Sequence, residues 1–117
     1  MKIVVTNNPM VRDKLPDAEF HDTDYLGVLK IVRDKIHLGH KLLTHPLSGS
    51  VKPGETPYKT VILSAKKGKL DESALSIIED SIQTCQKFMA NGAVRSWREE
   101  ILADFQLIDY DLIFSQR

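Results

Sequence analysis

The chain has 117 residues, and its sixteen Lys and Arg balance sixteen Asp and Glu. That length suits one domain, so we expect a single domain over residues 1–117. Zero net charge excludes a broad field that would draw the protein to nucleic acid or to an anionic membrane, and we expect neither as a partner. The apolar run 1–6 is too short for a signal peptide and is followed directly by polar residues, and no apolar run reaches the length of a membrane span. We therefore expect a cytoplasmic location.

The N-terminal third begins with an apolar, β-branched run over 2–6, which predicts a buried strand. Asn8 and Pro9 follow it and predict a short helix over 10–15, because proline suits the first helical position and asparagine can cap the free N–H groups. A weaker second strand is predicted over 18–21.

A longer helix is predicted next, capped by Asp22 or Thr23 and ended by Gly39. Two further strands are predicted over 41–44 and 60–64. The apolar positions of the helix keep helical spacing, and they are Tyr25, Leu29, Val32 and Ile36.

The C-terminal half reads as helical. Asp71 is placed to cap a helix over 72–90, and the pair Ser96 and Glu99 matches a capping box that begins another helix near residue 97. The apolar end of the chain then docks on the core, or Asp109 caps a separate last helix; the pattern allows both.

Strands that alternate with helices predict an α/β domain. We expect a small three-layer domain with a short, largely parallel sheet of about four strands and helices on its faces. The connection between the predicted strands 41–44 and 60–64 has no helical pattern. The last strand therefore either crosses over without a helix or pairs antiparallel.

Cysteine and histidine chemistry is not favoured by the sequence. Cys85 lies on the apolar stripe of the helix predicted over 72–90, which indicates a buried, unreactive thiol. With His21, the three histidines His37, His40 and His45 could suggest a metal centre. His37 lies near a helix end, whereas His40 and His45 flank the strand predicted over 41–44 and need not converge, so we expect no metal site.

Polar residues follow the predicted strands at the ends where parallel sheets bind ligands. Thr6, Asn7 and Asn8 follow the first strand, and Thr44 and His45 follow the third. If the strands are parallel, these residues gather at one edge of the sheet. His45, with its near-neutral pKa, is the candidate general acid or base there, and a capping or hydrogen-bonding histidine is the alternative.

The long polar connection after residue 44 is the candidate cover of that edge. Its hydroxyl groups, backbone N–H groups and lysine are suited to a small anion such as a phosphate or a carboxylate. A purely structural turn is the alternative. The candidate ligand-binding residues of this connection are Ser48, Gly49, Ser50 and Lys52.

The block 39–58, GHKLLTHPLSGSVKPGETPY, resembles the signature of the GrdX family, and the segments KIVVTNNP and DFQLID agree with it. The resemblance implies a small protein associated with the glycine, sarcosine and betaine reductase systems of amino-acid-fermenting anaerobes. It implies reductase components as partners and supplies no catalytic residue.

Three functions remain open. The leading hypothesis is a non-redox accessory protein that binds a small anion or a protein partner at the strand-end loops, because one buried cysteine does not suit a dithiol role. The second is a small enzyme that acts on a phosphorylated or carboxylated metabolite through His45. The third is a structural protein whose segment 105–114 forms an interface. The cofactor and the oligomeric state stay undetermined.

Overall fold

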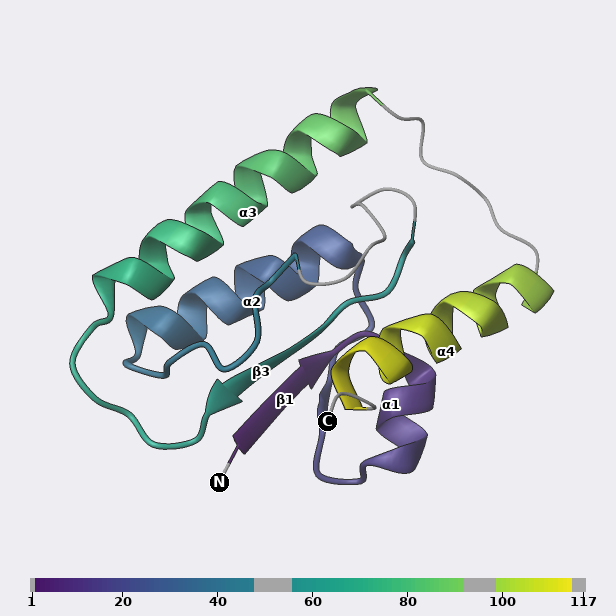
Figure 1. Ribbon diagram of the computed structural model, residues 1–117, viewed down its shortest axis with the longest axis horizontal. Helices are drawn as coiled ribbons and strands as arrows, with labels where there is room; N and C mark the ends of the chain where they lie inside the picture. The colour runs from purple at the N-terminus through teal and green to yellow at the C-terminus, as the bar shows by residue number, and fades with distance from the viewer. Residues whose placement is uncertain (1, 48–55, 92–98, 115–117) are drawn as a thin grey trace.

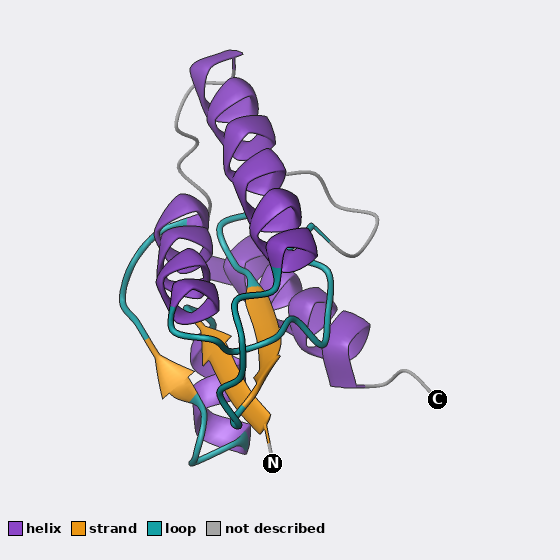
Figure 2. Cartoon of the chain, turned by 90° about the vertical axis from the view of Figure 1, so that its left-hand side faces the viewer, coloured by secondary structure: helices purple, strands orange, loops and turns teal. Residues whose placement is uncertain are grey.

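The computed structural model describes residues 2–47, 56–91 and 99–114 (Figure 1). Strands lie at the centre with helices around them (Figure 2), which confirms the α/β class. The elements are β1 (Lys2–Thr6), α1 (Pro9–Lys14), β2 (Glu19–Phe20), α2 (Tyr25–His37), β3 (Thr60–Ser64), α3 (Glu72–Asn91) and α4 (Glu99–Phe114).

Among the residues that the structure describes, the sheet has three strands in the order β2-β1-β3 and is mixed, so the predicted sheet of about four largely parallel strands is not confirmed. β1 pairs in parallel with β2 and antiparallel with β3. The antiparallel alternative for the last strand is therefore the correct one. Thr6 lies opposite Thr60 in this register, which sets the end of β1 beside the start of β3.

The predicted strand 41–44 forms only an isolated bridge, between Leu42 and Leu63. The hydroxyl of Thr44 accepts the backbone N–H of Ile62 at 2.9 Å. A side chain thus takes the hydrogen bond that a carbonyl would take in a regular ladder, and the pairing stops there.

The two faces of the sheet differ in chemistry because successive strand residues point to opposite sides. Val5, Val61 and Leu63 belong to the apolar core built with α2 and α3. Thr6 and Thr60 point the other way, toward α4. α3 packs on α2, and α4 packs on α1 and β3.

Two predicted helix caps are confirmed. The Asn8 side chain accepts the N–H of Met10 at 2.9 Å at the start of α1, and that of Asp71 accepts the N–H of Ala74 at 3.1 Å at the start of α3. Gly39, at a φ of 105°, follows the end of α2.

Other boundary predictions fail. The cap of α2 is Asp24, not Asp22 or Thr23, because the Asp24 carboxylate accepts the N–H of Gly27 at 2.7 Å. α4 runs through Asp109 without a break, so no separate last helix begins there. The predicted capping residue Ser96 lies outside the described residues, so that cap stays a prediction.

Cys85 is fully buried in the apolar core, as its helical spacing predicts. Burial raises the pKa of its thiol to about 11. Over the described ranges, no helix has both the length and the apolar character needed to cross a membrane.

Candidate functional site

A chain of hydrogen bonds runs from the end of β1 to α4. The Asn8 backbone N–H donates to the Thr6 hydroxyl at 3.0 Å, and the Thr6 and Thr60 hydroxyl oxygens lie 2.8 Å apart. The Thr60 hydroxyl donates to Oδ2 of Asp109 at 2.6 Å. A hydroxyl carries one proton, and that of Thr60 is donated to Asp109, so the Thr6 hydroxyl must donate to Thr60. Both hydroxyl protons of this hydrogen-bond network therefore point toward the Asp109 carboxylate.

Asp109 is the acceptor that closes this network. Its side chain comes from α4, is only 6% exposed, and also accepts the Asn8 amide Nδ2 at 2.9 Å. The same amide donates to the backbone carbonyl of Gln106 at 2.9 Å. Two residues 101 positions apart in sequence are therefore joined by a buried, charge-assisted contact.

Asn7 ties three loops together beside that network. Its amide Nδ2 donates to the carbonyls of Thr23 and Pro57, both at 2.8 Å. Its Oδ1 accepts the backbone N–H of Lys59 at 2.9 Å. Asn7 is itself only 6% exposed, so its side chain serves as a buried brace between the loops.

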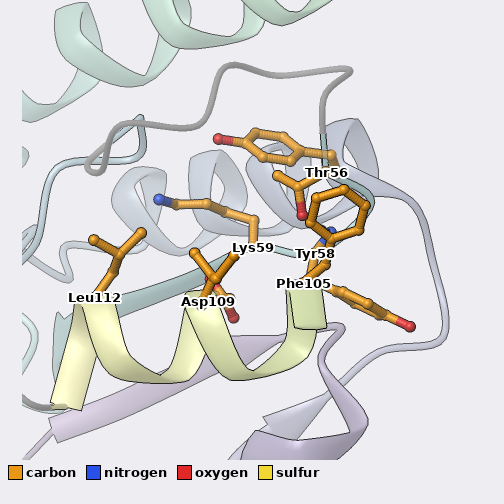
Figure 3. A pocket seen from close by; sticks show the side chains of 8 residues that line it. Thr56, Tyr58, Lys59, Phe105, Asp109 and Leu112 are labelled. Atoms are coloured by element: carbon orange, nitrogen blue, oxygen red, sulfur yellow. Dashed lines mark hydrogen bonds between the residues drawn. The ribbon is translucent and has the colours of Figure 1, made fainter. Parts of the chain in front are cut away.

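A small cavity of about 20 Å³ lies between α4 and the start of β3, which is room for roughly one water molecule. In Figure 3 the Lys59 side chain extends toward Leu112, whereas the Asp109 carboxylate points away from the Lys59 side chain. The lining combines a cation and an anion with apolar and hydroxyl groups, and its residues are Tyr25, Thr56, Tyr58, Lys59, Phe105, Ile108, Asp109 and Leu112.

Lys59 is only 4% exposed. Burial lowers the pKa of its ammonium group to about 8, and the nearby negative charge of Asp109 opposes part of that shift. Burial also raises the pKa of Tyr25, with smaller contributions from Cys85 and Asp109. The pocket therefore holds a lysine that can gain or lose its proton near physiological pH.

The structure brings Thr6, Asn7 and Asn8 together, but it uses their polar side chains internally. Thr44 bonds to β3 instead. His45 is exposed, and its Nδ1 accepts the N–H of Leu47 at 3.0 Å in a local turn, apart from the network. The candidates Ser48, Gly49, Ser50 and Lys52 lie outside the described residues.

Two of the other histidines, His21 and His40, have hydrogen-bond partners. His21 Nε2 lies 2.6 Å from a Glu19 carboxylate oxygen, and His40 Nδ1 lies 2.8 Å from the carbonyl oxygen of Ser64. His37 is exposed. No group of three His, Cys, Asp or Glu among the described residues is arranged to hold a metal ion.

Sequence reasoning missed Lys59, Thr60 and Asp109 as members of this region. One signal for Asp109 was available: it lies four residues after Phe105 and three before Leu112, so a lone acid occupies an apolar stripe. A charged residue on such a stripe indicates a buried polar contact.

Fold and site together define a small α/β protein in which a C-terminal helix is locked onto the strand ends by a buried carboxylate. The family model for GrdX-like protein matches residues 3–116, so the chain belongs to the GrdX-like family. The family name suggests an association with glycine reductase systems. Comparisons with curated proteins and with solved structures gave no match.

Proposed function

We propose that the protein is a cytoplasmic, non-catalytic accessory protein of a glycine, sarcosine or betaine reductase system. It acts by binding a protein partner on the outer side of α4, the helix that covers the strand ends. Membership of the GrdX-like family supports the reductase context. The partner site is supported by the way in which α4 distributes its apolar and charged residues.

The observation that carries the proposal is that α4 buries an acid and exposes large apolar residues. Asp109 is 6% exposed, whereas Leu107 is 47% exposed and Ile108 is 41% exposed. A helix with apolar residues all round is normally buried on all sides, yet this one has an open side. Complete burial of an exposed large apolar side chain contributes roughly 1.5–3 kcal/mol, and because Leu107 and Ile108 are already more than half buried, a partner that covers them gains about 1 kcal/mol for each.

The strand-end polar groups support this choice over an anion at the same place. The side chains of Thr6, Asn7 and Asn8 are already bonded to other parts of the chain. An anion would have to displace these bonds, and each buried group left without its partner costs about 1–3 kcal/mol. The outer side of α4 is open without any such rearrangement.

The test is binding of purified glycine reductase components to wild type, Leu107→Ser and Leu43→Ser, measured by calorimetry. Leu43 is a matched control because it is 51% exposed and lies outside α4. Leu107→Ser is expected to weaken binding about tenfold, equivalent to about 1.4 kcal/mol. Leu43→Ser is expected to leave binding unchanged. Equal binding by all three proteins would refute the α4 site.

A second candidate is binding of a small anion at the Lys59 pocket, which is favoured by a buried lysine beside a cavity. The cavity admits a group of about one water's size, so only the charged end of a ligand would enter it. The connection residues Ser48, Gly49, Ser50 and Lys52 are proposed contacts for the rest of the ligand. Thermal unfolding with phosphate, acetyl phosphate, glycine, sarcosine and betaine tests this, with Lys59→Met as the variant that should lose any shift.

Catalysis through His45 is the remaining alternative. Its exposed position leaves the ring accessible, although Nδ1 is engaged with Leu47. Turnover of any of the same compounds that is lost in His45→Ala, with binding retained, would favour the enzyme over the accessory protein.

A further inference from the structure

The open side of α4 is acidic as well as apolar. Between residues 99 and 114 the sequence has five Asp or Glu and no Lys or Arg. Glu100 and Asp104 lie one turn apart and are exposed, and Leu107 lies one turn further along the same side. Within the described ranges, no ion pair involves Glu100 or Asp104.

We propose that the partner surface that docks on α4 is basic, with Lys or Arg side chains around an apolar centre. This inference rests on the proposed function. The apolar centre covers Leu107 and Ile108, which are both more than 40% exposed. The basic rim faces Glu100 and Asp104. Opposite charges at the edge of an interface speed association and reject wrong partners, because like charges in contact cost several kcal/mol.

The same charge pattern excludes one occupant, a second copy that pairs α4 against α4. Such a pair would bring the acidic side chains Glu100 and Asp104 of one helix against the acidic side of the other. Symmetric self-contact requires a surface that complements itself, and a helix with acids and no bases on its exposed side does not.

The chain itself offers one competing surface of the right chemistry. The connection between β3 and α3 carries Lys66, Lys67 and Lys69, all exposed, followed by Leu70 at 46% exposure. It lies at the opposite end of the molecule from α4 (Figure 1). The backbone N–H of Gly68 donates to the Gly39 carbonyl at 2.9 Å, which holds the turn in place. The experiment must therefore distinguish binding of a reductase component from head-to-tail association of two copies of this chain.

The experiment measures the binding of purified glycine reductase components to the full-length protein, as wild type and as the double variant Glu100→Lys/Asp104→Lys. The matched control is Asp34→Lys/Asp80→Lys, which changes the net charge equally at two exposed positions on α2 and α3. Binding is measured at about 50 mM and about 500 mM salt, where the Debye length falls from more than 10 Å to about 4 Å. Sedimentation velocity of the protein alone is recorded in parallel.

The expected result is an affinity loss of about tenfold or more for Glu100→Lys/Asp104→Lys at low salt, which shrinks at high salt, with the control unchanged. Wild-type affinity in that variant, with a loss in Leu107→Ser, would overturn the basic partner while the proposed function stands. Absence of component binding, or binding unaffected by Leu107→Ser, would overturn both. Self-association abolished by Lys66→Glu/Lys67→Glu would assign the surface to a second copy.

Discussion

Replacing Asp109 with alanine tests the buried network most directly. The carboxylate accepts hydrogen bonds from Thr60 at 2.6 Å and from Asn8 at 2.9 Å. Asp109→Ala removes both bonds and the link between α4 and the strand ends. The Thr60 hydroxyl loses its acceptor, while the Asn8 amide keeps the Gln106 carbonyl.

The loss can be sized from these contacts. Hydrogen bonds to a charged group contribute about 1.5–3 kcal/mol each, and relief of the desolvation of a buried carboxylate offsets part of the sum. We expect Asp109→Ala to lower the free energy of unfolding by about 3 kcal/mol, which lowers the Tm by roughly 10 °C in a domain of this size. Urea unfolding followed by circular dichroism measures the change.

Two companion variants sharpen the result. Asp109→Asn keeps the shape and one acceptor oxygen, so its loss should be about 1 kcal/mol. In a double-mutant cycle, Thr60→Val and Asp109→Ala should be less than additive by about 1 kcal/mol, because both remove the same hydrogen bond. Strict additivity, or an Asp109→Ala variant within about 0.5 kcal/mol of wild type, would show that the Asp109 carboxylate does not hold α4 on the strand ends.

Three further predictions concern single sites. Lys59 has a folded pKa of about 8 against an ordinary 10.5, so the folded state carries a burial penalty of about 3 kcal/mol below pH 8 that disappears as the pH rises toward 10.5. The stability of Lys59→Met relative to wild type should therefore fall between pH 8 and pH 10 in urea titrations. Gly39→Ala should lower the free energy of unfolding by about 2 kcal/mol or more, because its φ is 105° and a Cβ would meet the Gly68 carbonyl oxygen. Gly68→Ala, where a Cβ meets nothing within 4 Å, is the control; equal stability of the two variants would contradict this account. Cys85 should react with a thiol reagent only on unfolding, since it is fully buried with its pKa raised to about 11, and fast labelling of the native protein would disprove that burial.

Local features of the fold were predictable from short stretches of sequence. The strand over 2–6, the strand over 60–64 and the caps Asn8 and Asp71 agree with the structure. Each depends on neighbours within a few residues: β-branched apolar runs favour strands, and side-chain oxygens satisfy the free N–H groups of the turn that follows.

The edge and end of the sheet were not predictable in this way. The apolar segment 41–44 has the composition of a strand, yet the Thr44 hydroxyl takes the N–H of Ile62 and only one bridge forms. Nothing within the segment sets its partner. Whether segment 41–44 pairs as a strand depends on which backbone groups of β3 lie opposite it, and that is decided by the tertiary structure.

The amino-acid sequence alone was enough to predict an α/β protein, a buried Cys85 and a group of polar residues after β1. The role of those polar residues depends on the tertiary structure. Asp109 reads as a cap from its neighbours, but α4 turns it toward Thr60 and Asn8, where a buried carboxylate must find donors. Those donors are far away in sequence, so the contact that locks α4, and with it the apolar face α4 leaves open, arises only when the chain has folded.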